Sequence, residues 1–335
     1  MIKLKTIFIT AVAVMISSQA IARDQIKIVG SSTVYPYTTV VAERFGKLGK
    51  FKAPVVESTG TGGGFKSFCG GVGVEHPDMT GASRAIKKEE VELCAKNGVT
   101  EIIELPIGND GITFAHSVKA KDANFTKAQL WKAIAHDVVI DGKLVKNPYK
   151  NWKEIDKSLP DLKIEVLVPP PTSGTRDAWD SLIMGKGCDP EFLKLVDNKK
   201  KCKKYREDAA VIEAGENDTL IVQKLGSTPN AFGYFGYSYL LANKDKIKAA
   251  KIEGKAPSIE GIQKYTYPVA RPLFLYAKKA HANVIPGFKE FLTEYTGKTA
   301  VGSTGYLYKV GLVPNSKETE DKVRGVATKL IAMKN

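Results

Sequence analysis

The sequence is poor in the residues that build metal and redox sites. Among its 335 residues it has only four cysteines and four histidines, and no Cys-x-x-Cys pair. A structural zinc site needs closely spaced ligand pairs. The histidines do not supply them, because they are scattered singly, at His76, His116, His136 and His281. We therefore expect no metal and no cofactor.

Long apolar segments are also missing. The run from Ile7 to Ile16 is much shorter than the ~20 residues that a membrane-spanning helix needs, and no later segment approaches that length without a charge. The run follows Lys3 and Lys5 and precedes the small-x-small step at residues 20–22, an order typical of a secretory signal peptide. We expect residues 1–22 to be a signal peptide cleaved after Ala22, and the rest to be a soluble periplasmic protein.

All four cysteines follow this segment, in a chain that we expect to enter an oxidising compartment. The first is Cys69, so we expect no lipid anchor on a new N-terminal cysteine. An even number of cysteines in such a chain predicts disulfides. The pairs that lie close in sequence are Cys69 with Cys94 and Cys188 with Cys202, and we predict both.

Acidic residues are outnumbered: 50 Lys and Arg face 36 Asp and Glu, for a formal net charge of +14. A basic surface can attract nucleic acids, acidic partners or small anions. The lysines are spread along the chain, with small clusters at residues 199–204 and 244–255, and no basic stripe with interleaved aromatic residues accompanies them. We expect no nucleic-acid partner, and a solvated basic surface explains each cluster.

Short apolar strands alternate with amphipathic helices, which predicts an α/β protein with a largely parallel sheet. The length is sufficient for two domains of ordinary size. Predicted strands are residues 26–29, 54–57, 101–105, 112–116, 163–168 and 272–276. Predicted helices are residues 126–135, 176–184, 218–225, 287–295 and 321–333, and a further helix has an apolar face with Val40, Val41, Phe45 and Leu48.

Three polar loops rich in hydroxyls and glycine, residues 30–33, 58–64 and 172–175, occur where a strand ends and a helix should begin. Ligands bind at the carboxyl ends of strands in open α/β sheets. The first turn of a helix also offers unpaired N–H groups to an anion. The glycine run is not a P-loop, because Phe65 stands where glycine is required. Helix capping explains any one loop equally well, but three such loops together predict an anion site.

Four motifs resemble those of the periplasmic phosphate-binding proteins of phosphate-specific ABC transporters. They are GSSTVYP at 30–36, TGTGGGF at 59–65, GASRAIK at 81–87 and TSGTRDA at 172–178. Their order and spacing agree along essentially the whole chain after the signal peptide. GYFGY at 233–237 is similar to a further turn of this family, where we expect aromatic packing rather than ligand contact.

The resemblance implies a type II periplasmic binding protein fold, with two α/β lobes and a central ligand cleft. Lobe I would comprise residues 23–108 and 272–335, and lobe II residues 109–271, with hinge crossings near residues 105–112 and 269–273. It further implies a monomeric, non-enzymatic protein that closes around inorganic phosphate and delivers it to an ABC transporter permease in the inner membrane.

Carried over by position, the expected ligand-binding residues are Ser32, Thr33, Val34, Thr61, Gly62, Ser83 and Arg84 in lobe I, and Ser173, Gly174, Thr175 and Arg176 in lobe II. Two positions depart from the family. Pro169 stands where many relatives have arginine, and Arg84 stands where some have an aspartate that accepts the proton of hydrogen phosphate. Arg84 and Arg176 together could neutralise a doubly charged phosphate. Asp110 is a candidate acceptor, although forming a turn explains it as well.

Other functions remain open on the residues alone. The ligand could be another tetrahedral oxyanion, such as phosphite, a phosphonate or sulfate. A secreted phosphatase has weaker support, because Ser173 lies in no G-x-S-x-G motif and no clustered metal ligands are present. A secreted interaction protein that keeps the fold without binding a small anion is the third class.

Overall fold

A computed structural model of the protein describes residues 23–334. The predicted signal peptide and its cleavage after Ala22 lie outside this range. Within it, no helix combines the length and the apolar character that crossing a membrane requires.

Strands and helices alternate through most of the chain. The first part contains β1 (Lys27–Gly30), α1 (Tyr35–Lys47), β2 (Val55–Ser58), α2 (Thr61–Phe68), β3 (Met79–Ala82), α3 (Lys88–Lys96) and β4 (Ile102–Ser117). The middle contains β5 (Asn124–Phe125), α4 (Lys127–Ile134), β6 (Asp137–Ile140), β7 (Lys143–Lys146), α5 (Trp152–Ile155), β8 (Val166–Val168), α6 (Gly174–Trp179), a π-helical turn (Asp180–Met184), α7 (Pro190–Leu195), a 3-10 turn (Lys199–Lys203), β9 (Val211–Glu213), α8 (Asp218–Ser227), β10 (Phe232–Gly236), α9 (Tyr237–Ala242), β11 (Ile247–Ala249), β12 (Lys251–Ile252) and α10 (Ile259–Gln263). The last part contains β13 (Ala270–Lys278), a 3-10 turn (Lys279–His281), α11 (Phe288–Tyr295), α12 (Lys298–Val301), α13 (Tyr306–Lys309) and α14 (Lys317–Lys329).

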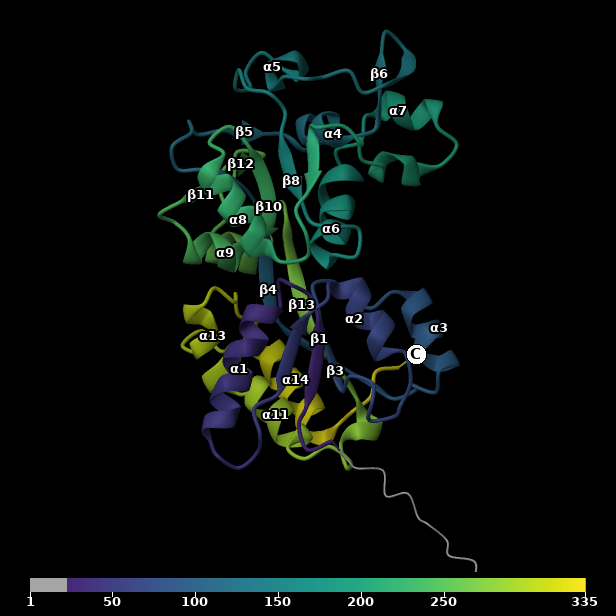
Figure 1. The fold of residues 1–335 in the computed structure, drawn as a ribbon, viewed down its shortest axis with the longest axis vertical. Coiled ribbons are helices and arrows are strands. Elements are labelled where there is room, and N and C mark those ends of the chain that lie inside the picture. The colour runs from purple at the N-terminus through teal and green to yellow at the C-terminus, as the bar shows by residue number, and fades with distance from the viewer. Residues whose placement is uncertain (1–22, 335) are drawn as a thin grey trace, which may run out of the picture.

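The main sheet has nine strands in the order β2-β1-β3-β13-β4-β10-β8-β9, with β11 also paired to β4. β1 is parallel to β2 and β3, and β8 is parallel to β9 and β10. Residues 102–111 of β4 pair with the antiparallel strand β13, whereas residues 112–117 pair with β10 and β11. β4 and β13 therefore join two groups of strands, and they pass between the upper and lower bodies of the molecule (Figure 1).

The two bodies have separate hydrophobic clusters. That of the upper body draws on residues 112–270 and Val313, and its centre includes Phe114 of β4, whose ring lies 5.2 Å from that of Phe232. The lower body has a large cluster from residues 26–107 and 273–327 and a smaller one that includes Phe65, Cys94 and Tyr276. This separation supports the proposed lobe I, in the lower body, and lobe II, in the upper body. We use these names below.

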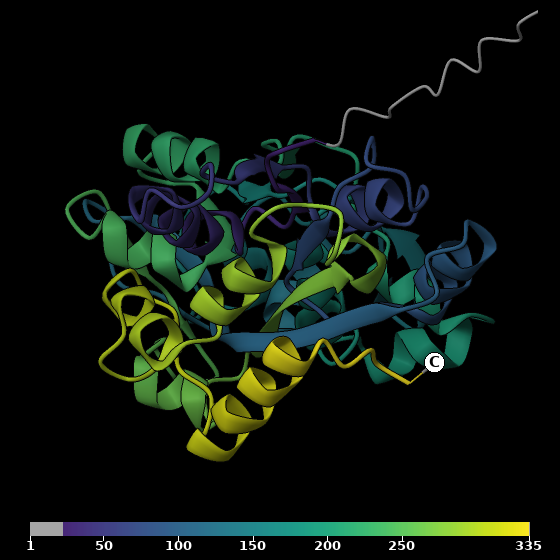
Figure 2. The same ribbon diagram turned by 90° about the horizontal axis from the view of Figure 1, so that it is seen from below.

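Local chemistry accounts for several helix starts. Thr126 and Gln129 form a capping box at the start of α4, in which each side chain accepts a hydrogen bond from the backbone N–H of the other. Pro36 lies in the first turn of α1, where its missing N–H costs nothing. Ser316 caps α14, so this helix begins four residues before the predicted start at Asp321 and ends at Lys329. Figure 2 shows α14 crossing β4 on the lower side of the molecule.

Three predictions about strands and helices are corrected by the structure. The main sheet is not largely parallel, because β13 is antiparallel to β3 and β4, and β4 is antiparallel to β10 and β11. Residues 101–105 and 112–116 belong to one strand, because Asn109, Asp110 and Gly111 continue the ladder opposite β13 instead of turning. Leu48 does not belong to the apolar face of α1, because the helix ends at Lys47 and Leu48 is 69% exposed.

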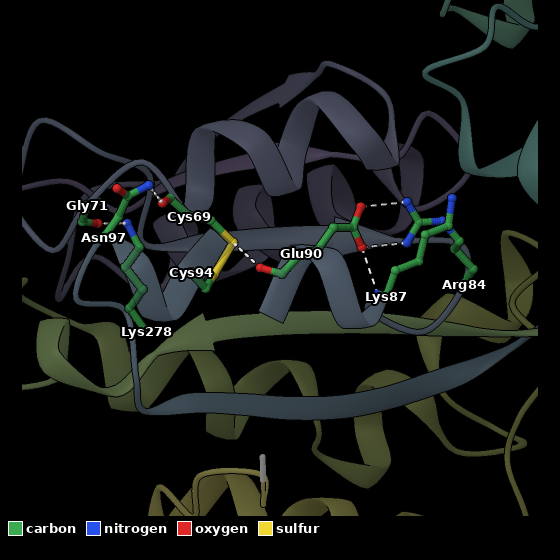
Figure 3. Close-up of a disulfide and its surroundings, with 8 residues drawn as sticks. All are labelled: Cys69, Gly71, Arg84, Lys87, Glu90, Cys94, Asn97 and Lys278. Carbon is green, nitrogen blue, oxygen red and sulfur yellow. Dashed lines mark hydrogen bonds and ion pairs between the residues drawn. A yellow bond between two sulfur atoms is a disulfide. The ribbon is translucent and has the colours of Figure 1, made fainter. Parts of the chain in front are cut away.

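Both predicted disulfides are confirmed. Cys69 at the end of α2 bonds to Cys94 in α3, with an S–S distance of 2.03 Å (Figure 3). Cys188 bonds to Cys202 and encloses α7 within lobe II. The first bond thus ties together two helices of lobe I that precede and follow β3.

Candidate anion-binding site

Two threonine hydroxyls from opposite lobes meet at the centre of the molecule. Thr33 follows β1, and Thr175 lies in the first turn of α6, and their Oγ1 atoms are 2.8 Å apart. Both residues are fully buried. Ser173 caps α6 by accepting a hydrogen bond of 3.1 Å from the backbone N–H of Thr175. The first and third predicted loops therefore converge on one point.

The second loop joins them. Thr61 begins α2, and its Oγ1 lies 3.2 Å from both the hydroxyl and the backbone N of Ser83, which follows β3. A side chain on Gly174 would collide with the hydroxyls of Thr61 and Ser83. Glycine at position 174 is thus what allows lobe II to approach lobe I so closely. Thr33, Thr61, Ser83 and Thr175 are called the hydroxyl cluster below.

A third contact crosses the lobes nearby. The backbone N–H of Gly62 donates a hydrogen bond of 3.0 Å to the carbonyl of Thr172.

Within lobe I, the backbone N–H groups of Thr33 and Val34 donate hydrogen bonds of 3.2 and 3.4 Å to the Ser31 hydroxyl. The side chain of Val34 belongs to the hydrophobic cluster of lobe I, so only its backbone is near the hydroxyl cluster.

The charge at this site comes from Arg271 of β13, which sequence reasoning missed. Its Nη2 donates hydrogen bonds of 2.9 Å to Thr33 Oγ1 and 3.0 Å to Thr175 Oγ1, and its Nη1 donates one of 3.1 Å to the carbonyl of Gly174. Only 3% of Arg271 is exposed. The available signal was a charged residue next to an apolar strand segment, in residues 270–278. Arginine is rarely buried without a partner, so its presence there indicates a buried polar site.

That partner is Asp110, which lies opposite Arg271 in the ladder of β4 and β13. Asp110 Oδ2 accepts hydrogen bonds of 3.1 and 3.0 Å from Arg271, and Oδ1 accepts one of 2.9 Å from the backbone N–H of Tyr237. Burial raises the pKa of Asp110, and the charge of Arg271 opposes this rise. Asp110 is thus a partner that orients Arg271, and the carboxylate is already occupied by these donors.

Arg84 and Arg176, the predicted sources of positive charge, make their hydrogen bonds outside the hydroxyl cluster, although Arg84 lines the same cavity as Ser83 and Arg271. Arg84 binds the carboxylates of Glu90 and Asp177. Arg176 binds Glu213 at 2.7 Å. Its guanidinium also lies 4.0 Å from the ring centre of Tyr205. Both guanidiniums thus pair with carboxylates outside the hydroxyl cluster, whereas Arg271, which is paired with Asp110, also donates hydrogen bonds to Thr33 and Thr175.

A second buried carboxylate, Asp218, was predicted only as part of a helix. It begins α8, is fully buried, and lies 3.4 Å from the Ser32 hydroxyl across the lobe boundary. The backbone N–H of Gly236 lies 3.4 Å from its other oxygen. Burial raises the pKa of Asp218 to about 7. Tyr239 also reaches Ser32, by donating a hydrogen bond of 3.0 Å to its carbonyl.

Chemically, the site combines a guanidinium with hydroxyl donors from two lobes, a set that suits a tetrahedral oxyanion. A cavity of about 500 Å³, lined in part by Ser83, Arg271 and the surface residues Lys200 and Lys203, reaches the cluster from outside. In the described range of 23–334, no group of three or more histidine, cysteine or acidic residues is arranged to hold a metal ion.

Comparison with known proteins identifies the family of this chain. The family model described as a PBP superfamily domain matches residues 17–299. Protein SphX of Synechococcus elongatus is 35% identical over 296 residues, which cover 85% of this chain and 76% of SphX. Phosphate-binding protein PstS of Staphylococcus epidermidis is 32% identical over 286 residues, which cover 83% of this chain and 77% of PstS. The chain belongs to the PstS-like family of the PBP superfamily.

A solved structure agrees with this membership. The crystal structure of a possible phosphate binding protein from Planctomyces limnophilus is 29% identical, with a TM-score of 0.59, and the match covers 91% of this chain and 98% of that chain. The predicted fold class, α/β of the periplasmic binding protein type, is thereby confirmed. In this PstS-like chain, the hydroxyl cluster and Arg271 lie where the two groups of strands meet.

Proposed function

We propose that this PstS-like protein binds inorganic phosphate between its two lobes in the periplasm and delivers it to the permease of an ABC importer. The observation that carries the proposal is the convergence of Thr33, Thr175 and Arg271. Two hydroxyls from opposite lobes and one buried guanidinium point to the same place. Only a closed molecule brings these donors to a single anion.

The relatives support the choice of ligand, because several of them are named for phosphate binding. The two disulfides and the predicted signal peptide support an oxidising compartment. The family is one of binding proteins, so catalysis is not part of the proposal. A different tetrahedral oxyanion remains the alternative ligand, and calorimetry distinguishes it.

The test is calorimetric titration of ligand-free protein with phosphate, arsenate, sulfate and phosphite. We expect one phosphate per chain, and we expect Arg271→Ala to abolish measurable binding because the site then lacks its guanidinium. Arg324→Ala is the matched control, since Arg324 pairs with Asp321 on the surface of α14. If Arg271→Ala does not fold, Thr175→Val serves instead and should weaken phosphate binding at least ~10-fold, the usual scale of a lost hydrogen bond to a charged group. Absence of heat with all four anions would refute the proposal.

A further inference from the structure

Asp177, on α6 of lobe II, pairs with two cations of lobe I. Its Oδ2 accepts hydrogen bonds of 2.6 Å from Arg84 Nε and 3.0 Å from Lys87 Nζ. Among residues 23–334, these are the ion pairs that join residues of lobe I to residues of lobe II as the lobes are defined above. In Figure 1, α6 faces α2 across the same boundary. The pairs therefore exist only while the two lobes are together.

The lobe I side of this contact is held in place. Glu90 of α3 accepts hydrogen bonds of 2.8 and 2.7 Å from the two terminal nitrogens of Arg84, and one of 2.8 Å from the backbone N–H of Lys87 (Figure 3). Glu90 lies one helical turn before Cys94, which the disulfide ties to Cys69. With its terminal nitrogens fixed on Glu90, Arg84 presents Nε to lobe II without having to order a free side chain.

We propose that Arg84, Lys87 and Asp177 form a latch that holds the lobes closed and slows release of the ligand. The inference rests on the proposed function, since it concerns closure over the same site. Only 13% of the Arg84 side chain and 25% of that of Asp177 are exposed, so solvent screens this pair less than a fully exposed one. A contact made only in the closed form shifts the equilibrium toward that form and raises the apparent affinity.

The sign of the effect separates the latch from simple electrostatics. Asp177 lies in the first turn of α6, the turn that contains Thr175 of the hydroxyl cluster. A negative charge at that position repels an anion bound at the start of the helix. Loss of the charge alone would therefore tighten binding of an anion, whereas loss of a latch must weaken it. Asp177→Asn distinguishes the two.

The experiment follows release of radiolabelled phosphate after addition of excess unlabelled phosphate. We expect Asp177→Asn to release phosphate about 3- to 10-fold faster than the parent protein, the scale of one or two partly exposed ion pairs. The association rate should change little. Glu213→Gln is the matched control, because it breaks the pair with Arg176 within lobe II and should leave the release rate unchanged.

Two further measurements exclude a merely structural effect. Thermal unfolding without phosphate should give the same midpoint for Asp177→Asn and Glu213→Gln, because neither lobe loses an internal contact of its core. Arg84→Ala combined with Asp177→Asn should release phosphate no faster than the faster single variant, since one partner already removes the contact between them.

The outcomes are distinct for the two proposals. If the parent protein binds no phosphate, the proposed function fails. If the parent binds phosphate and Asp177→Asn releases it at the parental rate or more slowly, the latch is refuted while the function stands. Fully additive effects of Arg84→Ala and Asp177→Asn would also refute the latch.

Discussion

At the scale of single residues, the site is organised around a buried ion pair. Burying a charge is costly unless a partner and hydrogen bonds compensate it. Arg271 finds both, in the carboxylate of Asp110 and in the hydroxyls of Thr33 and Thr175. The family motifs gave the hydroxyls but pointed to Arg84 and Arg176 for the charge. Those motifs could not reveal Arg271, because it lies in β13, which is distant from all of them in the sequence.

We expect Asp110→Asn to lower the free energy of unfolding by about 3 kcal/mol, because it leaves the buried charge of Arg271 without its counter-charge. Urea denaturation without phosphate measures this change. Asp321→Asn, which disrupts the exposed pair with Arg324, should cost less than about 1 kcal/mol. Equal costs for the two variants would contradict the structural role of Asp110. Asp110→Asn should leave the preference for phosphate over sulfate unchanged. Asp110 already accepts hydrogen bonds from Arg271 and Tyr237, so it is not free to accept the proton of hydrogen phosphate.

Asp218 gives a prediction about pH. Its pKa is about 7 in the folded protein against an ordinary value of 3.8. Between these two values the folded state binds more protons than the unfolded state, so the free energy of unfolding falls as pH rises from about 4 to 7. Asp218→Asn removes this decrease in the free energy of unfolding, because asparagine does not titrate. Relative to the parent, the variant should therefore gain more than about 1 kcal/mol between pH 4.5 and pH 8 in urea denaturation with phosphate saturating both proteins, which keeps the lobes closed over Asp218. Parallel pH profiles for parent and variant would show that Asp218 does not titrate in this range.

At the scale of elements, sequence patterns located most of the helices that carry the site but not the path of β4. The three polar loops were predicted from their hydroxyls, and the structure brings all three together. Asn109, Asp110 and Gly111 have the composition of a turn, yet pairing with β13 keeps them extended. β10 was missed because GYFGY reads as a turn, whereas its aromatic residues are buried and Tyr234 stacks on Trp179 at 4.2 Å. In both segments, packing against residues distant in the sequence determines the strand conformation, and a local sequence pattern does not contain that information.

The start of α6 gives a prediction at this scale. Gly174→Ala places a methyl group against the hydroxyls of Thr61 and Ser83, which belong to the other lobe. Lobe II alone accommodates alanine at a helix start, so the free energy of unfolding of ligand-free protein should change by less than about 1 kcal/mol. Closure is blocked, and phosphate affinity should fall at least ~10-fold, since overpacking costs about 1–3 kcal/mol. Gly325→Ala in α14 is the control, because nothing lies within 4 Å of the added methyl group. Parental affinity in Gly174→Ala would contradict the close approach of the lobes.

At the scale of the whole molecule, two strands connect the lobes, and a small set of polar contacts holds them together. β4 and β13 cross the boundary, while Thr33–Thr175, Gly62–Thr172 and Ser32–Tyr239 are hydrogen bonds between side chains or backbone of opposite lobes. Polar contacts of this kind can be exchanged for water when the lobes separate. The fold class and the two-lobed plan followed from the sequence through the family motifs, but which contacts close the cleft depends on side chains that meet only in the folded protein.

We therefore expect the ligand-free protein to open and phosphate to close it, because an anion held by donors from both lobes stabilises the closed form over the open one. Small-angle scattering should give a smaller radius of gyration with saturating phosphate than without it. Gly174→Ala provides the internal comparison: its radius should stay at the ligand-free value at a phosphate concentration that saturates the parent. Closure should also stabilise the folded state by about 2.7 kcal/mol at a phosphate concentration 100 times the Kd, which urea denaturation can measure. If the parent protein gains this stability with no change in radius of gyration, phosphate binds without lobe movement. That result would refute the closing motion but not the proposed site.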